Sequence, residues 1–152
     1  MLEFINVTHK YEKNNVIDNF SMKIESNSVT SLLGSSGSGK TTLLRLATGL
    51  EKIQHGKIIF NGSIDSNNKN NLNTESRNIG YVFQDCALFP HLNVEENIFY
   101  GLTTGNKKIL DKINILLKNN NFLHYTKRYP HELSGGQKQL VAVFRALASD
   151  PK

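Results

Sequence analysis

Apolar positions recur along this chain at two spacings, which predict strands in some segments and helices in others. Alternating or continuous apolar residues predict strands over residues 2–7, 20–24, 29–33, 57–60 and 78–83. The run from Val29 to Leu33 suits a buried strand. Asn61-Gly62 follows the strand at 57–60 and is a strong turn signal. The polar, asparagine-rich residues 63–76 are expected to form an exposed loop.

Helical spacing predicts four further elements. After Thr41 the leucines that recur at this spacing are Leu43, Leu44, Leu46 and Leu50. Residues 94–100 and 107–118 also look helical, and a Thr-Thr-Gly turn around Gly105 separates them. A final helix is expected to start near Gly136, with one apolar face made of Leu140, Phe144, Leu147 and Ala148.

A glycine-rich loop with the spacing Gly34-x-x-x-x-Gly39-Lys40-Thr41 lies between the strand at 29–33 and the first helix. Glycines let the backbone approach a phosphate, and successive N–H groups at a helix N-terminus bind the anion. Lys40 supplies a cation for the β- and γ-phosphates, and the Thr41 hydroxyl suits Mg²⁺. A connector without a ligand is the alternative, but strand, loop, Lys-Thr and helix rarely coincide by chance. The loop therefore predicts a site for a nucleoside triphosphate.

Composition limits the classes of protein that this chain resembles. Its 152 residues, with 38% hydrophobic and 20% charged, fit one soluble globular domain. No apolar run approaches the roughly 18 residues of a membrane span, and the N-terminus has no signal-peptide core, so we expect a cytosolic chain. Cys86, the only cysteine, excludes an internal disulfide and is expected to be a small buried hydrophobe. The net charge of +5 is scattered and favours a solvated surface rather than a nucleic-acid interface.

A second candidate anion site is the sequence LSGGQ at residues 133–137. Ser134-x-x-Gln137 is a capping box, which many helices use without any ligand. Two consecutive glycines alter this interpretation, because Gly136 early in a helix lowers helix stability. The glycines bare the N–H groups of Gly135 and Gly136 at a positive helix end, beside the Ser134 hydroxyl. Two phosphate-binding devices in one chain are far more specific than either alone.

With these two motifs the chain resembles the ATP-binding-cassette ATPases over nearly its whole length. Three further segments carry the resemblance: LLRLATGLEKIQHGKIIFNG, RNIGYVFQDCALFPHLNVEENIFYGL and YPHELSGGQKQLVAVFRALASDPK. The FQ-x-x-x-LFPHL segment is most similar to bacterial importers that serve iron, inorganic oxyanions, polyamines or sugars. The resemblance implies an α/β P-loop NTPase fold, with a RecA-like core, N-terminal antiparallel strands and a helical subdomain. Residues 1–84 would form the strands and P-loop core, 85–132 the helical subdomain and 133–152 the signature motif and its helix.

The resemblance also assigns roles to individual residues. ATP would be bound by Tyr11, Gly34, Ser35, Ser36, Gly37, Ser38, Gly39, Lys40, Thr41, Thr42, Ser134, Gly135, Gly136 and Gln137. Tyr11 would stack on adenine, although a surface-packing tyrosine is nearly as consistent with the spacing. Gln84 matches the glutamine that senses Mg²⁺ and the attacking water, so Gln84 and Lys40 are the catalytic candidates and Thr41 and Gln84 the metal candidates. The signature would close over the γ-phosphate of a second subunit in a head-to-tail homodimer.

The partners that the resemblance implies are membrane permease subunits and, indirectly, a solute-binding protein, at the cytoplasmic face of the inner membrane. Phe89-Pro90-His91 would lie near the permease contact. No nucleic-acid partner is expected. A soluble cassette ATPase that acts on DNA or ribosomes is a less favoured alternative, because no sustained heptads separate the two motifs.

Several positions depart from the family pattern. Leu140 stands where these importers usually carry arginine, Phe144 where alanine is common, and Ser35 where proline is frequent. No acid occupies the place of the Walker B aspartate or the catalytic glutamate, and the switch histidine has no counterpart. Asp85 and Asp150 are the nearest acids, and neither ends an apolar strand. The C-terminal part of the core is therefore expected to be missing and these residues alone to be inactive, which leaves a non-catalytic nucleotide-binding remnant as an alternative.

Overall fold

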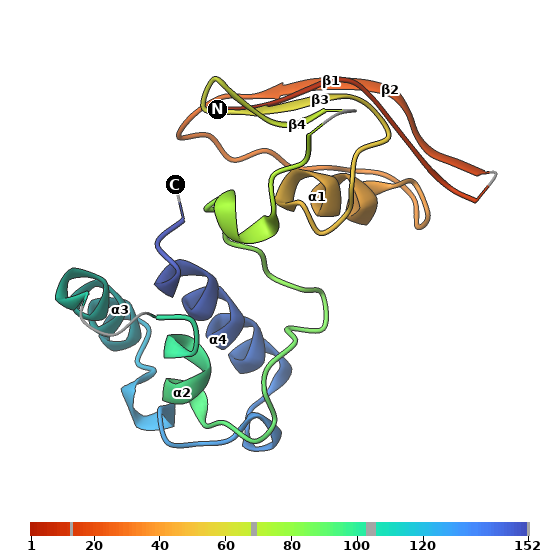
Figure 1. The fold of residues 1–152 in the computed structure, drawn as a ribbon. Coiled ribbons are helices and arrows are strands. Elements are labelled where there is room, and N and C mark those ends of the chain that lie inside the picture. The colour runs from red at the N-terminus through yellow and green to blue at the C-terminus, as the bar shows by residue number, and fades with distance from the viewer. Residues whose placement is uncertain (13, 68–69, 103–105, 152) are drawn as a thin grey trace. The chain divides into compact units, whose positions relative to one another are not determined.

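A computed structural model of the chain describes residues 1–12, 14–67, 70–102 and 106–151. The chain divides into two compact units, residues 1–77 and residues 78–152. In the first unit a sheet is covered on one face by helix α1, and the second unit is built from helices α2, α3 and α4 (Figure 1). None of the helices in the described part of the chain has the length and apolar character that a membrane span requires.

The sheet of the first unit has four antiparallel strands in the order β2-β1-β3-β4. The strands are β1 (Leu2–Tyr11), β2 (Asn14–Ile24), β3 (His55–Phe60) and β4 (Ser63–Asn67). The strands predicted at 2–7, 20–24 and 57–60 are therefore confirmed, and so is their antiparallel arrangement. The β3–β4 turn follows from Asn61-Gly62, whose φ angles of 48° and 83° are those of a tight hairpin turn.

A bulge explains why Phe4 and Val7 both face the core although they are three residues apart. Strict alternation would place them on opposite faces of the sheet. The pairing of β1 with β2 shifts register between these residues, and Asn6 takes a φ of 49°. Because the extra residue resets the alternation, Phe4 and Val7 are both buried beneath α1.

Helix α1 (Lys40–Thr48) covers the sheet with the apolar face that the leucine spacing predicted only in part. Leu43 and Leu46 are buried against the strands, whereas Leu44 and Leu50 stay 46% and 43% exposed. The predicted loop at 63–76 is also only partly correct, because its first residues form β4 and Thr74–Ser76 form a 3-10 turn, η1. Polar composition did not prevent pairing there, because an edge strand needs hydrogen bonds from one neighbour only.

Two predicted strands are wrong. Neither 29–33 nor 78–83 belongs to the sheet among the described residues, and Val29 and Leu33 are 99% and 93% exposed. A strand exists only where a neighbouring backbone supplies its hydrogen bonds, and apolar sequence cannot create that neighbour. The antiparallel sheet is confirmed, but the strands expected for a parallel core do not pair here.

The second unit contains α2 (Val94–Phe99), α3 (Lys107–Asn119) and α4 (Gly135–Ala148), with 3-10 turns η2 (Leu123–Tyr125) and η3 (Pro130–Glu132). The three predicted helices are thus confirmed to within about one residue, whereas the turn around Gly105 lies outside the described residues. The core of this unit joins all three helices, through Ile98 of α2, Ile113 of α3 and Val141 of α4. Of the apolar face predicted for α4, Phe144 and Ala148 are buried and Leu147 packs against the core, whereas Leu140 is 36% exposed. Val141, which the prediction did not include, is buried.

Candidate nucleotide-binding site

The loop from Gly34 to Gly39 has a backbone that glycine alone permits at two points. Gly37 and Gly39 adopt φ angles of 82° and 87°, which strain other residues. A Cβ on Gly39 would also lie 2.7 Å from Ile17 Cδ1 and 2.8 Å from the Val16 carbonyl oxygen. The end of the loop is therefore packed directly on β2, and its shape depends on the absence of a side chain.

Lys40 places its ammonium inside this loop. The Nζ atom donates to the carbonyl oxygens of Gly34 at 2.8 Å and Ser35 at 2.6 Å, and to Ser38 Oγ at 3.2 Å. These contacts fix a positive charge within the turn that the glycines create. The predicted pairing of a glycine-rich turn with a lysine cation is thus a local property of the folded loop.

The N-terminus of α1 keeps its backbone N–H groups available to an anion. Gly39 is the N-cap residue and offers no side-chain acceptor, and no acidic residue occupies the first turn. The four first N–H groups of a helix otherwise need such a partner, and the helix dipole adds positive potential there. Thr41 is exposed at this end, whereas Thr42 is buried. Lysine, uncapped amides and an exposed hydroxyl together fit a phosphate chain.

Tyr11 lies in the same unit, at the last position of β1, and is 40% exposed. Its hydroxyl donates to Glu51 Oε1 at 3.0 Å, and its ring meets His9 edge-to-face at 4.9 Å. The side chain is therefore partly exposed although it has both of these contacts. Glu51 was not among the predicted site residues, because nothing in its local sequence marks it as a partner of β1.

The signature motif begins α4 as a reciprocal capping box. Ser134 Oγ accepts from Gln137 N–H at 3.3 Å, and Gln137 Oε1 accepts from Ser134 N–H at 2.8 Å. A Cβ on Gly135 or Gly136 would meet nothing within 4 Å, and neither residue has a positive φ. Within the described chain, neither packing nor backbone strain requires these glycines. They leave open space over the helix end, where another molecule can approach the backbone.

Arg145 connects α4 to the segment that follows Gln84, a link the sequence did not predict. Its Nη1 and Nη2 atoms donate to the carbonyl oxygens of Ala87 at 2.9 Å and Cys86 at 2.8 Å, and its guanidinium lies over the Phe89 ring. Partial burial lowers the pKa of Arg145 from its ordinary value. Cys86, buried as predicted, and Ala87 both have positive φ angles, so the arginine holds an unusual backbone turn.

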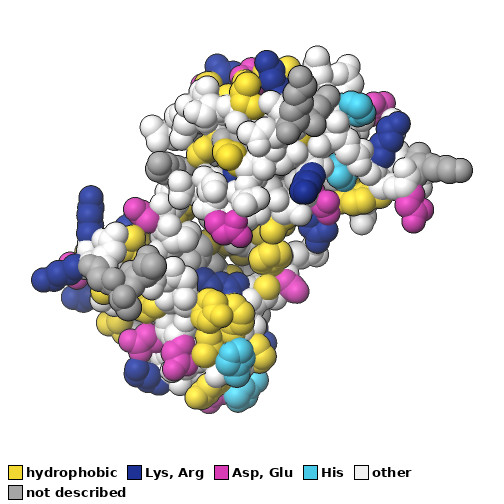
Figure 2. Space-filling model, viewed as in Figure 1, with side chains coloured by type: hydrophobic (Ala, Val, Ile, Leu, Met, Phe, Trp, Pro, Cys, Tyr) yellow, Lys and Arg dark blue, Asp and Glu magenta, His cyan; other side chains and the backbone are white. Residues whose placement is uncertain are grey.

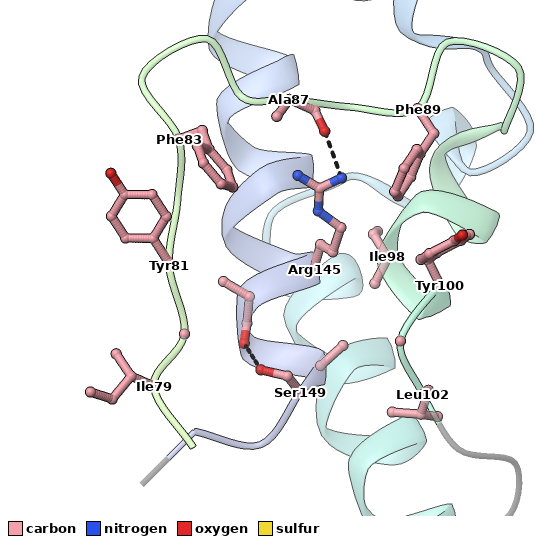
Figure 3. Close-up of a pocket in the computed structure, with 14 residues that line it drawn as sticks. Ile79, Tyr81, Phe83, Ala87, Phe89, Ile98, Tyr100, Leu102, Arg145 and Ser149 are labelled. Atoms are coloured by element: carbon pink, nitrogen blue, oxygen red, sulfur yellow. Dashed lines mark hydrogen bonds between the residues drawn. The ribbon is translucent and has the colours of Figure 1, made fainter. Parts of the chain in front are cut away.

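A pocket of about 430 Å³ adjoins Arg145 within the second unit. Figure 3 shows Arg145 extending from α4 toward Ala87 and Phe89, while the segment that carries Phe83 runs beside the same helix. Aliphatic side chains and aromatic side chains, Tyr100 among them, dominate the lining. Its chemistry suits an apolar partner rather than a phosphate.

Asn97, another residue that sequence reasoning missed, holds the segment from Phe89 to Leu92. Its side chain is fully buried and accepts from Phe89 N–H at 2.8 Å. The Nδ2 atom donates to the carbonyl oxygens of Phe89, Leu92 and Asn93. An asparagine on a helix with apolar neighbours signals such a role, since a buried amide must find partners.

The candidate residues fall into two groups. Tyr11 and the loop from Gly34 to Thr42 belong to the first unit, whereas Gln84, which is exposed, and the signature at 134–137 belong to the second. Among the described residues there is no cluster of three or more His, Cys, Asp or Glu side chains that would hold a metal by itself. On the face seen in Figure 2, cationic side chains are interspersed with acidic ones, as the scattered sequence charges predict.

Comparison with known proteins places these features in context. Residues 17–152 match the family model described as "ABC transporter". The chain is 42% identical over 154 residues to a sulfate/thiosulfate import ATP-binding protein CysA of Neisseria meningitidis, with 97% of this chain and 42% of that protein covered. It is 41% identical over 158 residues to CysA of Escherichia coli K12, with 99% and 42% covered. The chain thus spans less than half the length of these curated relatives.

Solved structures show the same similarity. The ATP-binding cassette MJ0796, in a dimeric post-hydrolysis state bound to ADP and Pi, matches with a TM-score of 0.80 and 30% identity. The match covers 99% of this chain and 71% of that one. The protein cbiO1 from Clostridium perfringens, part of the ABC transporter complex cbiONQ, matches with a TM-score of 0.82 and 27% identity, over 99% of this chain and 62% of that one. The mixed α/β fold is therefore that of an ATP-binding cassette.

Proposed function

Because this chain belongs to the ABC transporter family, we propose that it supplies the ATP-binding part of a subunit that powers solute import. The observation that carries the proposal is the loop from Gly34 to Thr41, where a fixed lysine ammonium and an uncapped helix end converge. This arrangement stabilises a polyphosphate through charge-assisted hydrogen bonds. Tyr11, in the same unit, accepts the base.

The magnesium ion that accompanies ATP would bind the phosphates and the Thr41 hydroxyl. Thr41 is exposed at the helix end, and its hydroxyl is a hard oxygen ligand of the type that Mg²⁺ prefers. The ion would neutralise phosphate charge in the reaction. Lys40 and the amides of α1 orient the β- and γ-phosphates for that chemistry.

A second subunit would use the open helix end at Ser134 to Gln137. No described residue lies within 4 Å of a Cβ added at Gly135 or Gly136, which supports this role, since a γ-phosphate needs close access to backbone N–H groups. The cassette MJ0796 is described as dimeric. Two copies of the ATP-binding subunit would enclose two ATP molecules head to tail.

The permease would contact the segment from Leu88 to Leu92 at the cytoplasmic face of the membrane. Asn97 forms hydrogen bonds to Phe89 and Leu92, and the Arg145 guanidinium lies over the Phe89 ring, so the segment has fixed contacts that support a surface for a partner. The CysA relatives are named for sulfate and thiosulfate import. An inorganic oxyanion is accordingly the first class of solute to test.

Hydrolysis would need groups that residues 1–152 do not place at the loop. The resemblance assigns a Walker B aspartate and a glutamate to positions with no counterpart in this sequence. A missing general base alone slows such a reaction by roughly 10²–10⁴-fold. We therefore propose that residues 1–152 by themselves bind ATP and release phosphate no faster than a Lys40 variant.

A nucleotide-binding measurement with matched lysine variants tests the central proposal. Lys40→Met is expected to weaken ATP binding by roughly 10- to 150-fold, because a charge-assisted contact contributes about 1.5–3 kcal/mol. Lys52→Met changes an exposed lysine beyond the other end of α1 and is expected to leave affinity unchanged. Titration calorimetry with ATP, and circular dichroism as a check of folding, distinguish the two. Equal ATP affinity in both variants would remove the loop from the nucleotide site.

The importer assignment is tested separately by crosslinking. A photoreactive residue at Leu88 or Leu92 is expected to crosslink to a co-expressed permease, whereas one at Ile115, an exposed position on α3, is not. Crosslinks that run only to ribosomal protein or nucleic acid would support a soluble cassette ATPase instead.

A further inference from the structure

A short series of contacts links Tyr11 to the loop from Gly34 to Gly39, which is called the phosphate loop below. Gly39 packs against Ile17 of β2, where an added Cβ would come within 2.7 Å of the Ile17 side chain. Ile17 pairs across the ladder with His9 of β1, and His9 contacts Tyr11 edge-to-face. The end of the phosphate loop and the Tyr11 ring are therefore linked by two intervening residues of one sheet.

A second series of contacts links the C-terminal end of α1 to Tyr11. After α1 the chain turns at Gly49, whose φ is 78°, and reaches Glu51, whose N–H donates to the Arg45 carbonyl oxygen. Glu51 Oε1 then accepts from the Tyr11 hydroxyl at 3.0 Å. A phenol that donates to a carboxylate makes a stronger hydrogen bond than one that donates to a neutral group.

Gln54 reinforces this connection between the loop after α1 and β1. Its Oε1 accepts from Lys10 N–H at 2.8 Å, and its Nε2 donates to the Lys10 carbonyl oxygen at 2.9 Å. Lys10 directly precedes Tyr11, so the backbone on one side of the tyrosine and the hydroxyl at the tip of its ring are held by the same loop. This arrangement restricts both ends of the side chain.

His9 completes the support as a packed ring rather than a polar group. It is 4% exposed, and neither ring nitrogen has a hydrogen-bond partner among the described residues. Burial of an unpaired imidazole is unfavourable. The edge-to-face packing against Tyr11 at an interplanar angle of 82° is a favourable ring contact, and it ties the orientation of His9 to that of Tyr11.

We infer that Glu51 and His9 are positioning residues that hold the Tyr11 ring ready to stack on the nucleobase of a bound nucleotide. The inference rests on the proposed nucleotide-binding function. Tyr11 remains 40% exposed, so the support leaves ring surface for the base. A ring ordered before the ligand arrives loses less conformational entropy on binding. Base affinity should therefore depend on Glu51 through its hydrogen bond to the Tyr11 hydroxyl.

The test compares ATP with inorganic tripolyphosphate, which carries the phosphates but no base. Base stacking on an aromatic ring changes affinity by roughly 5- to 150-fold, so Tyr11→Ala should lower ATP affinity by that factor and spare tripolyphosphate. Glu51→Ala should weaken ATP binding by about 2- to 10-fold relative to tripolyphosphate. Glu51→Gln keeps an acceptor oxygen and should retain most of the parent affinity. Glu75→Ala, a change at an exposed acid of the same unit, should alter neither ligand.

A double-mutant cycle separates positioning from general damage. In a Tyr11→Phe background the hydroxyl is already absent, so adding Glu51→Ala should cause no further loss of ATP affinity. For His9, His9→Phe keeps a packed ring and should preserve the ratio of ATP to tripolyphosphate affinity, whereas His9→Ala should lower it. All titrations use the chain of residues 1–152, with thermal unfolding measured for each variant.

Each alternative outcome has a distinct meaning. The positioning role is overturned if Glu51→Ala lowers the affinities for ATP and tripolyphosphate by the same factor. It is also overturned if Glu51→Ala lowers ATP affinity as much in the Tyr11→Phe background as in the unmodified chain. If the parent chain binds both ligands equally tightly, the phosphate site stands but Tyr11 does not stack on the base. If the parent chain binds neither ligand, the proposed nucleotide-binding function itself fails and this inference fails with it.

Discussion

Replacement of Arg77 should destabilise helix α1, the helix that follows the phosphate loop. It is 2% exposed and lies at the C-terminal end of the first unit. Its Nη1 atom donates to the carbonyl oxygens of Leu46 at 3.0 Å and Ala47 at 2.8 Å, in the last turn of α1. The same guanidinium donates to Leu72 and to the hydroxyl of Ser66. Arg77→Met would remove every one of these bonds while keeping most of the side-chain volume.

The free energy involved follows from the acceptors that remain. The hydrogen bonds to Leu46, Ala47 and Ser66 are buried, so water does not replace the lost donors. A buried acceptor without a partner costs about 1–3 kcal/mol, and the loss of a cation at a helix C-terminus adds roughly 0.3–1 kcal/mol. Because the acceptors share one donor group and partly relax, we expect about 3–5 kcal/mol in total. A domain is stabilised by only about 5–15 kcal/mol, so much of the first unit's stability is at stake.

Hydrogen exchange measured by mass spectrometry locates the effect. Peptides covering residues 40–48 should exchange at least about 150-fold faster in Arg77→Met, because opening of α1 becomes about 3–5 kcal/mol easier. Peptides of α3 in the second unit should change little. The matched control is Arg45→Met, since Arg45 is also in the last turn of α1 but its side chain is exposed. We expect a change below about 0.5 kcal/mol there.

A substitution at Gly49 tests the same contact between Arg77 and the end of α1. Gly49 has a φ of 78°, and a Cβ at this position would lie 2.6 Å from Arg77 Nε. Gly49→Ala should therefore loosen the same α1 peptides through backbone strain and displacement of the guanidinium. The reasoning is refuted if the α1 peptides exchange as slowly in Arg77→Met as in the unmodified chain. It is also refuted if Arg45→Met speeds their exchange as much as Arg77→Met does.

Two further predictions concern the second unit. Gly135→Asp should preserve ATP binding by the monomer but prevent ATP-dependent dimerisation, because a carboxylate in the open space over the helix end repels phosphate. Light scattering measures the dimer, and an ATP-dependent dimer that persists in this variant would contradict the signature assignment. Phe144→Ala should cost about 3–5 kcal/mol in chemical denaturation, because the ring is 3% exposed and packs edge-to-face on Phe122 at 5.8 Å. Val143→Ala, at a 40% exposed neighbour, serves as its control, and equal losses would mean that Phe144 is not a core residue.

The phosphate loop was predictable from sequence because its chemistry is local. Gly37, Gly39 and Lys40 act through their own backbone angles and through carbonyl groups within six residues, so their spacing carries the necessary information. The capping box of Ser134 and Gln137 and the hairpin turn at Asn61-Gly62 were predictable for the same reason. In each case a short segment satisfies its own hydrogen bonds or selects its own dihedral angles.

The wrong predictions share the opposite property. The apolar runs at 29–33 and 78–83 match the composition of buried strands, yet a strand depends on neighbours that composition does not specify. The bulge at Asn6 likewise overrides the alternation of β1, because the core beneath the sheet accepts both Phe4 and Val7. The apolar spacing of α4 likewise did not distinguish Leu140, which is 36% exposed, from Val141, which the core of the second unit buries.

Long-range support of the site was decided by the tertiary structure alone. Glu51 reaches Tyr11 across 40 residues of sequence, Arg77 reaches Ala47 across 30, and Arg145 reaches Ala87 across 58. Each is a charged side chain whose type and neighbours are ordinary in the sequence. The sequence by itself determined the shape of the loop from Gly34 to Lys40, because its glycines and its lysine act through backbone angles and carbonyl groups of the same short segment. Only the folded chain determined the residues that hold those elements in place, because hydrogen bonds between distant segments exist only after packing has brought donor and acceptor together.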